Sequence, residues 1–232
     1  DCLLSRGLGD VYKRQVLVMF MALMNVIPVV ATIFGAAYAV QPAYGIGFDK
    51  SVYLWIPVVG NIVAVLVIPF VGNLSDKIGR RPTMIAGCLG SGLLAFVYLY
   101  AISIQNVPMA FAASIVMWGM VYQGYNAVFP SFYPELFHTR YRVTAMAIAQ
   151  NIGTMLTAML PALFAMVAPP GSDNIPLVVG GLAFFITGVC ALAAYIAPET
   201  HRLAMDDLGN PDAKPMDCLL YTSPSPRDKR QS

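Results

Sequence analysis

Charged residues are scarce in this sequence. Only 11% of the 232 residues are Asp, Glu, Lys or Arg, whereas 58% are hydrophobic. Ordinary soluble domains carry about a quarter charged residues, so the composition argues against that class. The charges nearly cancel, to a formal net charge of +2, and there is no basic excess for a nucleic acid to bind. We therefore expect no nucleic-acid partner.

Cysteine and histidine are also rare, with four and two residues. Cys88 and Cys190 lie within apolar segments, where a free cysteine behaves as a small apolar side chain, so we expect no disulfide framework. His138 and His201 lie in polar connections and lack metal-ligand spacing. We expect no metal and no cofactor. An enzyme embedded in a membrane would need a nucleophile–base or metal pair in its apolar segments, and none occurs.

Long apolar segments dominate the chain. Six of them reach the length of about 20 residues that a helix needs to cross a bilayer. None contains Asp, Glu, Lys, Arg or His, whereas each helix of a soluble bundle would show a polar stripe. The sequence therefore predicts an all-α membrane protein with six transmembrane helices. The expected spans are 16–43, 52–74, 83–103, 108–133, 143–168 and 175–197.

The charges between the spans predict the orientation of the chain. Connections 75–82 and 134–142 carry five Lys and Arg residues, and Arg202 follows the last span. The three opposite connections carry only Lys50. Cytoplasmic loops carry the excess of Lys and Arg, so the first group is expected on the cytoplasmic side. We expect a multi-pass protein of the cytoplasmic membrane with both ends in the cytoplasm.

The two ends of the chain share short words that do not form a structural period. The word DCLL occurs at 1–4 and 217–220, and KRQ occurs at 13–15 and 229–231. These ends resemble in-frame translations of the adaptors used in sequencing libraries, and such scars are excluded from fold reasoning. The natural protein is then expected to continue upstream of Val16. The expected segments are a non-native segment 1–15, a transmembrane domain 16–199, a cytoplasmic tail 200–215 and a non-native segment 216–232.

Four of the few charges gather in GNLSDKIGRRP, residues 72–82. Gly72 and Gly79 would let the chain turn tightly, and Asp76 could face the positive end of a helix. Arg80 and Arg81 offer planar forks to carboxylates. We interpret the segment as a latch that ties two moving helix bundles at the membrane surface. The alternative, a loop that only sets topology, would need the Lys and Arg residues alone.

This segment resembles the signature loop of the major facilitator superfamily, whose pattern is G-x-L-S/A-D-K/R-x-G-R-R/K-P. Segment 134–146 resembles the connection between the fourth and fifth helices of the C-terminal half in metabolite:proton symporters and sugar porters, although the family usually has Pro at the place of His138. PETHR, residues 198–202, resembles the Pro-Glu-Thr after their last helix. The resemblance implies half of a twelve-helix fold, made of two three-helix inverted repeats, with an N-terminal six-helix half as its partner.

The resemblance also implies a cytoplasmic gate, in which Glu135 pairs with Arg80 or Arg81 and with Arg140 or Arg142. Glu135 is the only acid of its connection, and a carboxylate near the membrane boundary favours a cationic partner. The expected residues of the gate and signature loop are Gly72, Asp76, Lys77, Gly79, Arg80, Arg81, Glu135, Arg140 and Arg142.

Amide side chains are absent from the third and sixth spans and present in the other four. This division repeats every three helices, and it fits repeats whose third helix is outermost and faces lipid. The remaining spans would then surround a polar cavity. A hydrogen bond between helices, worth about 0.6 kcal/mol, is the alternative role of each polar residue. The substrate-binding candidates are Asn25, Thr32, Asn61, Tyr122, Gln123, Asn126, Gln150 and Thr154.

These features predict a secondary transporter that moves a small polar metabolite, an organic acid or an osmolyte, through the lipid bilayer by alternating access. The resemblance implies proton coupling. Because no span contains a titratable acid or histidine, the proton-carrying carboxylate is expected in the N-terminal half. Two alternatives stay open: a sugar porter of the same superfamily, and a complete six-helix channel or receptor-like protein that begins near Val16.

Overall fold

The fold was examined in a computed structural model that describes residues 2–201. This part of the chain is helical and contains no strand, and it has six helices long and apolar enough to cross a membrane. The predicted all-α fold with six spans is confirmed. Of the expected tail 200–215 only Thr200 and His201 are described, and 216–232 lies outside the described residues. Helix α1 begins at Cys2, so it runs through the expected non-native segment 1–15.

The spans begin and end as follows. Span one is Gly9–Val40, span two Lys50–Ile78, span three Arg80–Ser103, span four Val107–Glu135, span five Arg142–Val167 and span six Ile175–Ile196. Span one holds the part of α1 (Cys2–Ala22) from Gly9 onward, then η1 (Leu23–Asn25), α2 (Val26–Pro28), η2 (Val29–Phe34) and α3 (Gly35–Val40), and η3 (Pro42–Tyr44) follows it. Spans two and three are α4 (Lys50–Ile78) and α5 (Arg80–Ser103). Span four holds α6 (Val107–Ser114), η4 (Ile115–Val121), α7 (Gln123–Asn126) and α8 (Phe129–Glu135). Span five holds α9 (Arg142–Ala158) and α10 (Leu160–Val167), and span six is α11 (Ile175–Ile196).

Local chemistry explains where several helices begin. Asp49 precedes α4, and its side chain accepts a hydrogen bond of 2.7 Å from the amide of Ser51. Asn106 precedes α6, and its side chain accepts one of 3.0 Å from the amide of Met109. These are N-caps, which satisfy amides that have no partner inside the helix.

Spans one and four are interrupted by wide π-helical turns, η2 and η4. Pro28 precedes η2 and has no backbone N–H, so the regular hydrogen-bond ladder is broken there. Trp118 lies in η4, and its carbonyl accepts a hydrogen bond of 2.8 Å from the side chain of Gln123, the first residue of α7. This bond gives a carbonyl of the widened turn a partner. Both π turns lie in the first helix of an expected three-helix repeat, and such turns often occur at functional sites.

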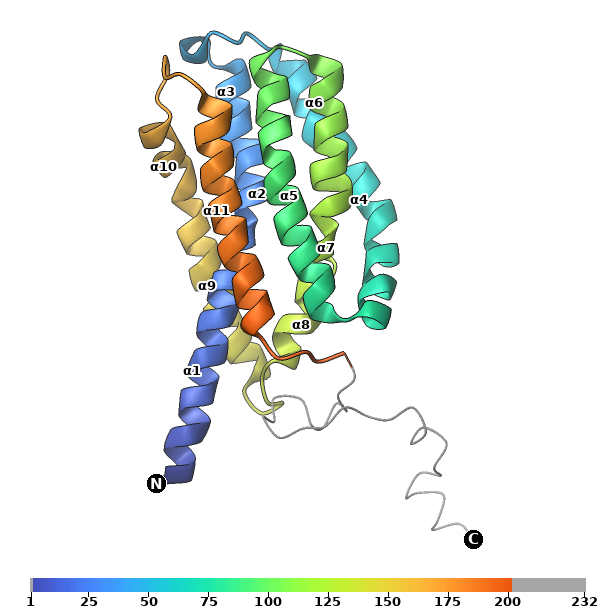
Figure 1. Ribbon diagram of the computed structural model, residues 1–232, viewed down its shortest axis with the longest axis vertical. Coiled ribbons are helices and arrows are strands. Elements are labelled where there is room, and N and C mark those ends of the chain that lie inside the picture. Colours follow the sequence, from blue (N-terminus) through green and yellow to red (C-terminus); the bar gives the residue numbers. More distant parts are fainter. Residues whose placement is uncertain (1, 202–232) are drawn as a thin grey trace.

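The six spans form a bundle (Figure 1). The most extensive contacts between spans follow the order five, one, six, three, four, two, which is called the row below, and the end of span one also contacts spans two and three. On one side α1 packs along α9 and against α11, and in the middle α11 packs along α5. On the other side α5 contacts η4, which packs along α4. Spans one, two and three take the same places in this order, read from one end, as spans four, five and six take when it is read from the other end. That symmetry is the arrangement expected of two three-helix repeats.

The third helices of the two repeats pack on each other. Spans three and six were expected to be outermost in the complete fold, and within this half α5 and α11 form its most extensive helix contact. In the apolar 18-residue stretch of each span, 50% is buried within this half for α5, compared with 17% for α4 and 22% for span five. The described half therefore leaves α4 and span five the most exposed. The outermost, lipid-facing position of the third helices is defined relative to the other half of the fold, and it stays a prediction.

One close crossing fixes α5 against span four. A side chain at Gly87 would come within 2.7 Å of the backbone nitrogen of Tyr125 and within 2.8 Å of Gly124. The helices meet backbone to backbone at this point, an approach that only small residues allow in membrane bundles.

Candidate functional site

The signature segment 72–82 is mostly helical, and it contains one turn where the sequence predicted two. Gly72 lies inside α4, which continues to Ile78, so the tight turn expected at Gly72 is wrong. The chain turns at Gly79 alone, with φ 122° and ψ 156°, a conformation that side-chain-bearing residues rarely adopt. A Cβ atom at Gly79 would also lie 2.8 Å from Oε2 of Glu199. Glycine is required here for the backbone angle and for the approach of this carboxylate.

Arg80, the first residue of α5, is the centre of a polar cluster. Its Nη2 donates to Oε1 of Glu135 at 3.2 Å, and its Nε lies 3.4 Å from Oε2 of the same carboxylate. It also forms an ion pair with Asp76 and donates to the hydroxyl of Ser75 at 2.9 Å. The side chains of Arg80 and Glu135 are only 14% and 19% exposed. A fork-shaped contact of this kind, sheltered from water, is among the stronger side-chain interactions.

Glu199, which follows α11, caps the beginning of α5. Its carboxylate accepts hydrogen bonds from the backbone amides of Arg80 at 2.9 Å and Arg81 at 3.0 Å. The amides of Thr200 and His201 also donate to it. Burial acts to raise the pKa of Glu199, but the four amides outweigh it and hold the pKa below its usual range. A carboxylate at a helix N-terminus is also favoured by the helix dipole.

Thr200 and Arg81 extend these contacts. The hydroxyl of Thr200 donates to Glu135, so the segment after α11 reaches the end of span four. Arg81 donates to the carbonyls of Ala194 and Tyr195, and its guanidinium lies over the Tyr195 ring at 5.3 Å. The last carbonyls of a helix lack partners within it, and a cation there also complements the dipole. The Arg80 cluster is defined here as Ser75, Asp76, Arg80, Glu135, Glu199 and Thr200.

The structure brings some of the expected gate residues together and leaves others apart. Glu135 forms its ion pair with Arg80, whereas the side chain of Arg81 donates to backbone carbonyls of α11. Arg142 donates to the carbonyl of Phe137 at 3.3 Å and to the Thr139 hydroxyl at 3.5 Å. Lys77 and Arg140 are exposed, and their side chains form no hydrogen bond or ion pair with the described residues. The cluster therefore joins the two three-helix repeats of this half, and the expected pairing of Glu135 with Arg140 or Arg142 is absent.

Sequence reasoning missed Glu199, Thr200 and Ser75. Glu199 and Thr200 belong to the Pro-Glu-Thr word after the last span, which served only to identify the half. The contact from Glu199 to the amide of Arg80 joins residues 119 positions apart. No helical spacing signals such a contact, so the motif itself was the available signal.

Four of the substrate-site candidates form one polar group on the side of α4 and span four. Asn61 accepts a hydrogen bond of 2.9 Å from the indole N–H of Trp118, and Trp118 stacks on Tyr122 with ring centroids 5.3 Å apart. Gln123 is buried and accepts a hydrogen bond of 3.0 Å from Asn126. Trp118 was not among the candidates, and it links Asn61 to the others.

A second, smaller group lies between η1 and α9, where Asn25 donates to the hydroxyl of Thr154 at 3.2 Å. Gln150 is half-buried one turn before Thr154 on the same helix. Thr32 is exposed and donates to the carbonyl of Pro28 at 2.8 Å, within its own span. No hydrogen bond among the described residues joins the two groups. The structure thus places the candidates in two separate polar groups, and the cavity expected around all eight stays a prediction.

Most of the chain resembles known transporters. The model of the Major Facilitator Superfamily matches residues 15–216. The cis,cis-muconate transport protein of Acinetobacter baylyi is 32% identical over 155 residues, which cover 67% of this chain and 34% of the relative. The proline/betaine transporter of Salmonella typhimurium is 30% identical over 45% of this chain and 21% of the relative. OusA of Dickeya dadantii, a glycine betaine/proline/ectoine/pipecolic acid transporter, is 29% identical over 42% of this chain and 19% of the relative.

The chain thus spans about a third or less of the length of these relatives. The relatives are transporters and not enzymes, as the sequence predicted. No solved structure matches the chain. The family match covers most of the chain, and the described part is a six-span helical bundle with the signature segment between its second and third spans. This multi-pass membrane protein belongs to the Major Facilitator Superfamily.

Proposed function

We propose that this chain forms the C-terminal half of a secondary transporter, which carries a small organic acid or osmolyte across the cytoplasmic membrane by alternating access. The names of the relatives support this substrate range, because they transport muconate, proline and betaines. The N-terminal six-helix half is the proposed partner. The low burial of α4 and span five supports this partner, since these two spans end the row and leave apolar surface uncovered.

The observation that carries the proposal is the Arg80 cluster. It ties the beginning of α5 to the ends of spans four and six through sheltered charged contacts. By the proposed orientation this end of the bundle is cytoplasmic. The cluster keeps the two repeats in one arrangement there, and Lys77 and Arg140 remain exposed to pair with acids of the other half. Opening toward the cytoplasm would break the contacts between the halves, and interfaces of this kind have discrete states.

The substrate would meet neutral hydrogen-bonding groups from this half. Asn25 and Thr154 pair with each other, as do Asn61 and Trp118, and each pair could exchange its partner for a substrate group. The amide of Asn25 and the indole N–H of Trp118 are donors for a carboxylate. The stacked rings of Trp118 and Tyr122 offer a face that attracts an ammonium group.

A proton-coupled cycle needs a side chain that gains and loses the proton inside the membrane. We propose that this side chain lies outside the present half. None of the six spans contains a titratable acid or histidine between the charges at their ends. An intramembrane carboxylate that relays a proton is therefore proposed for the N-terminal half.

The test is uptake by the product of the complete gene in proteoliposomes, with labelled cis,cis-muconate and labelled glycine betaine as probes. We expect saturable uptake of at least one probe, increased by an inward proton gradient. Uptake that ignores the gradient would reject proton coupling. Uptake of glucose in place of both probes would favour the sugar-porter alternative, and ion conductance by the six-span chain alone would favour a channel.

A further inference from the structure

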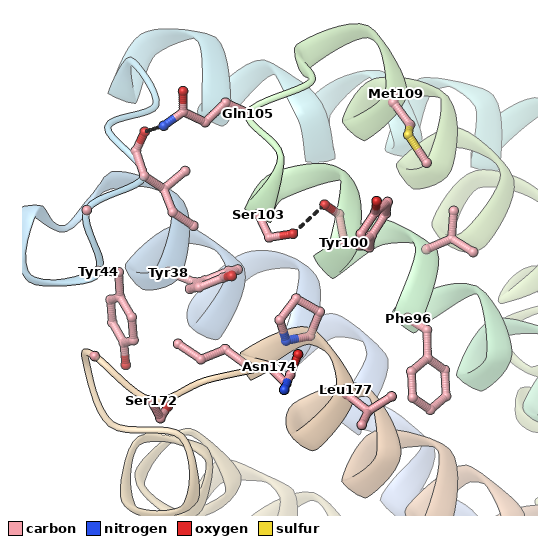
Figure 2. A pocket seen from close by; sticks show the side chains of 16 residues that line it. Tyr38, Tyr44, Phe96, Tyr100, Ser103, Gln105, Met109, Ser172, Asn174 and Leu177 are labelled. Atoms are coloured by element: carbon pink, nitrogen blue, oxygen red, sulfur yellow. Dashed lines mark hydrogen bonds between the residues drawn. The ribbon is translucent and has the colours of Figure 1, made fainter.

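A cavity of about 820 Å³ opens at the end of the bundle opposite the Arg80 cluster (Figure 2). Its walls come from the end of span one and the connection after it, from the end of α5, and from the beginning of α11. None of the expected substrate residues lines it. The cavity therefore needs an explanation separate from the transport site.

The lining of the cavity changes from apolar to polar along the helices. Phe96, Tyr100 and Ser103 follow the spacing i, i+4, i+7, so they share one face of α5. They extend over about 10 Å of the helix at 1.5 Å per residue. Phe96 lies near Leu177 at the apolar end, and Gln105 lies at the polar end (Figure 2). Because α5 ends at Ser103, the polar end is at the membrane–water boundary.

Tyrosines line the cavity between these ends, and no charged side chain of residues 2–201 does. Tyr38, Tyr44 and Tyr100 contribute their rings, whereas the lining contains no Asp, Glu, Lys, Arg or His. Tyrosine rings are enriched at this depth of a membrane, and their faces attract ammonium groups. An anionic ligand would find no cation in the lining, so a net-neutral ligand with an ammonium group fits best.

The backbone around the cavity is held in an uncommon conformation. Gln105 and Asn174 have φ of 56° and 58°, and they are the two non-glycine residues with positive φ in the described part of the chain. Both line the cavity, together with Gly45 and Gly171, which also have positive φ. The side chain of Gln105 donates to the carbonyl of Ile46 at 2.6 Å across the cavity wall. Such conformations gather at ligand sites, and here they fix the walls without a ligand.

We propose that this cavity binds a zwitterionic phospholipid with an ammonium headgroup, of the phosphatidylethanolamine type. The ammonium group lies against the tyrosine rings, and an acyl chain runs along Phe96 and Leu177. The volume supports this occupant, because it is at the upper end of the range for drug-sized ligands and exceeds what a small free osmolyte fills. The proposal depends on the membrane location of the chain and not on its transport activity.

The test is native mass spectrometry of the purified 232-residue chain in detergent, with equal amounts of phosphatidylethanolamine and phosphatidylglycerol. We expect phosphatidylethanolamine adducts to exceed phosphatidylglycerol adducts about tenfold, the ratio that a partly exposed cation–π contact of about 1.4 kcal/mol provides. Val97→Trp fills the cavity from an exposed position of its lining and should remove this preference. Leu93→Trp, one turn earlier on α5, exposed and outside the lining, is the matched control and should keep it.

Two results would overturn the proposal. Equal retention of the two lipids would show an unselective lipid shell, and an identical preference in Val97→Trp and Leu93→Trp would place the lipid elsewhere. Circular dichroism checks that each variant keeps its helices. If Val97→Trp loses its helices, Tyr100→Leu is the second variant, because it removes one tyrosine ring from a half-exposed position of the lining. Tyr100→Leu must then lower the ratio of phosphatidylethanolamine to phosphatidylglycerol adducts.

Discussion

Replacing Glu199 by Gln tests how the end of span six holds the beginning of α5. The substitution keeps the shape of the side chain but removes its charge and turns one acceptor oxygen into an NH₂ donor. Oε1 accepts from the amide of Arg80 and Oε2 from the amide of Arg81, so at least one amide of α5 loses its partner. A hydrogen bond to a charged group contributes about 1.5–3 kcal/mol. Since the side chain is 27% exposed, we expect a value near the lower end, about 2 kcal/mol.

The assay is reversible unfolding of the purified chain in mixed micelles with increasing SDS. A loss of about 2 kcal/mol changes the folded-to-unfolded ratio about thirtyfold. Asp173→Asn is the matched control, because Asp173 is an exposed acid in a connection and its side chain has no partner among the described residues. Surface changes of this kind stay within about 0.5 kcal/mol.

The effect of Glu199→Gln should depend on pH with a known sign. The folded protein holds the pKa of Glu199 below its ordinary value, so the carboxylate stabilises the fold fully above its unfolded pKa, which is about 4.3. That contribution is lost as the pH falls through the depressed folded pKa. The unmodified chain and the Glu199→Gln variant should therefore become equally stable in acid. Equal stability of Glu199→Gln and Asp173→Asn at pH 7, or a difference that persists unchanged in acid, would refute the reasoning.

Three further predictions use the same unfolding assay or uptake. Gly79→Ala should destabilise the chain by about 1–3 kcal/mol because of its backbone angle and the nearby Glu199, whereas Gly72→Ala inside α4 should stabilise it by about 0.5–1 kcal/mol; equal effects would contradict the turn at Gly79. Arg80→Gln and Glu135→Gln should each destabilise, and the double variant should lose less than their sum by about 1 kcal/mol, whereas strict additivity would show that the pair is not coupled. Trp118→Phe removes the hydrogen bond to Asn61 and should cost only about 0.6 kcal/mol of stability. In the complete transporter it should raise the KM for the substrate, and an unchanged KM would remove this group from the proposed site.

The positions of the spans could be predicted because lipid imposes both length and apolarity. The ends were less predictable, since a helix continues as long as its backbone is satisfied. The second span was expected to end at residue 74, yet α4 includes Ser75, Asp76 and Lys77 and ends at Ile78. The hydroxyl of Ser75 donates to the carbonyl of Gly72 at 2.8 Å, so the polar turn remains helical past the apolar segment.

The candidate site could be predicted only in part, for two physical reasons. Spacing along a helix shows which residues share a face, but it does not show which helix lies opposite. Asn25 and Thr154 meet because η1 packs on α9, and Asn61 meets Trp118 because α4 packs on η4. The role of Glu199 required the chain to return from its last span to the beginning of α5, a contact that no local pattern encodes.

The central claim is that the chain forms a six-span bundle whose Arg80 cluster lies at the cytoplasmic surface of the membrane. Cysteine labelling in intact cells tests this claim most directly. Single cysteines replace exposed Lys77 near the cluster and exposed Asp173 at the opposite end, with Cys2 and Cys218 changed to Ser and the buried Cys88 and Cys190 kept. The account predicts that an impermeant maleimide labels Asp173→Cys in intact cells and Lys77→Cys only after permeabilisation. Labelling of Lys77→Cys from outside intact cells would contradict it.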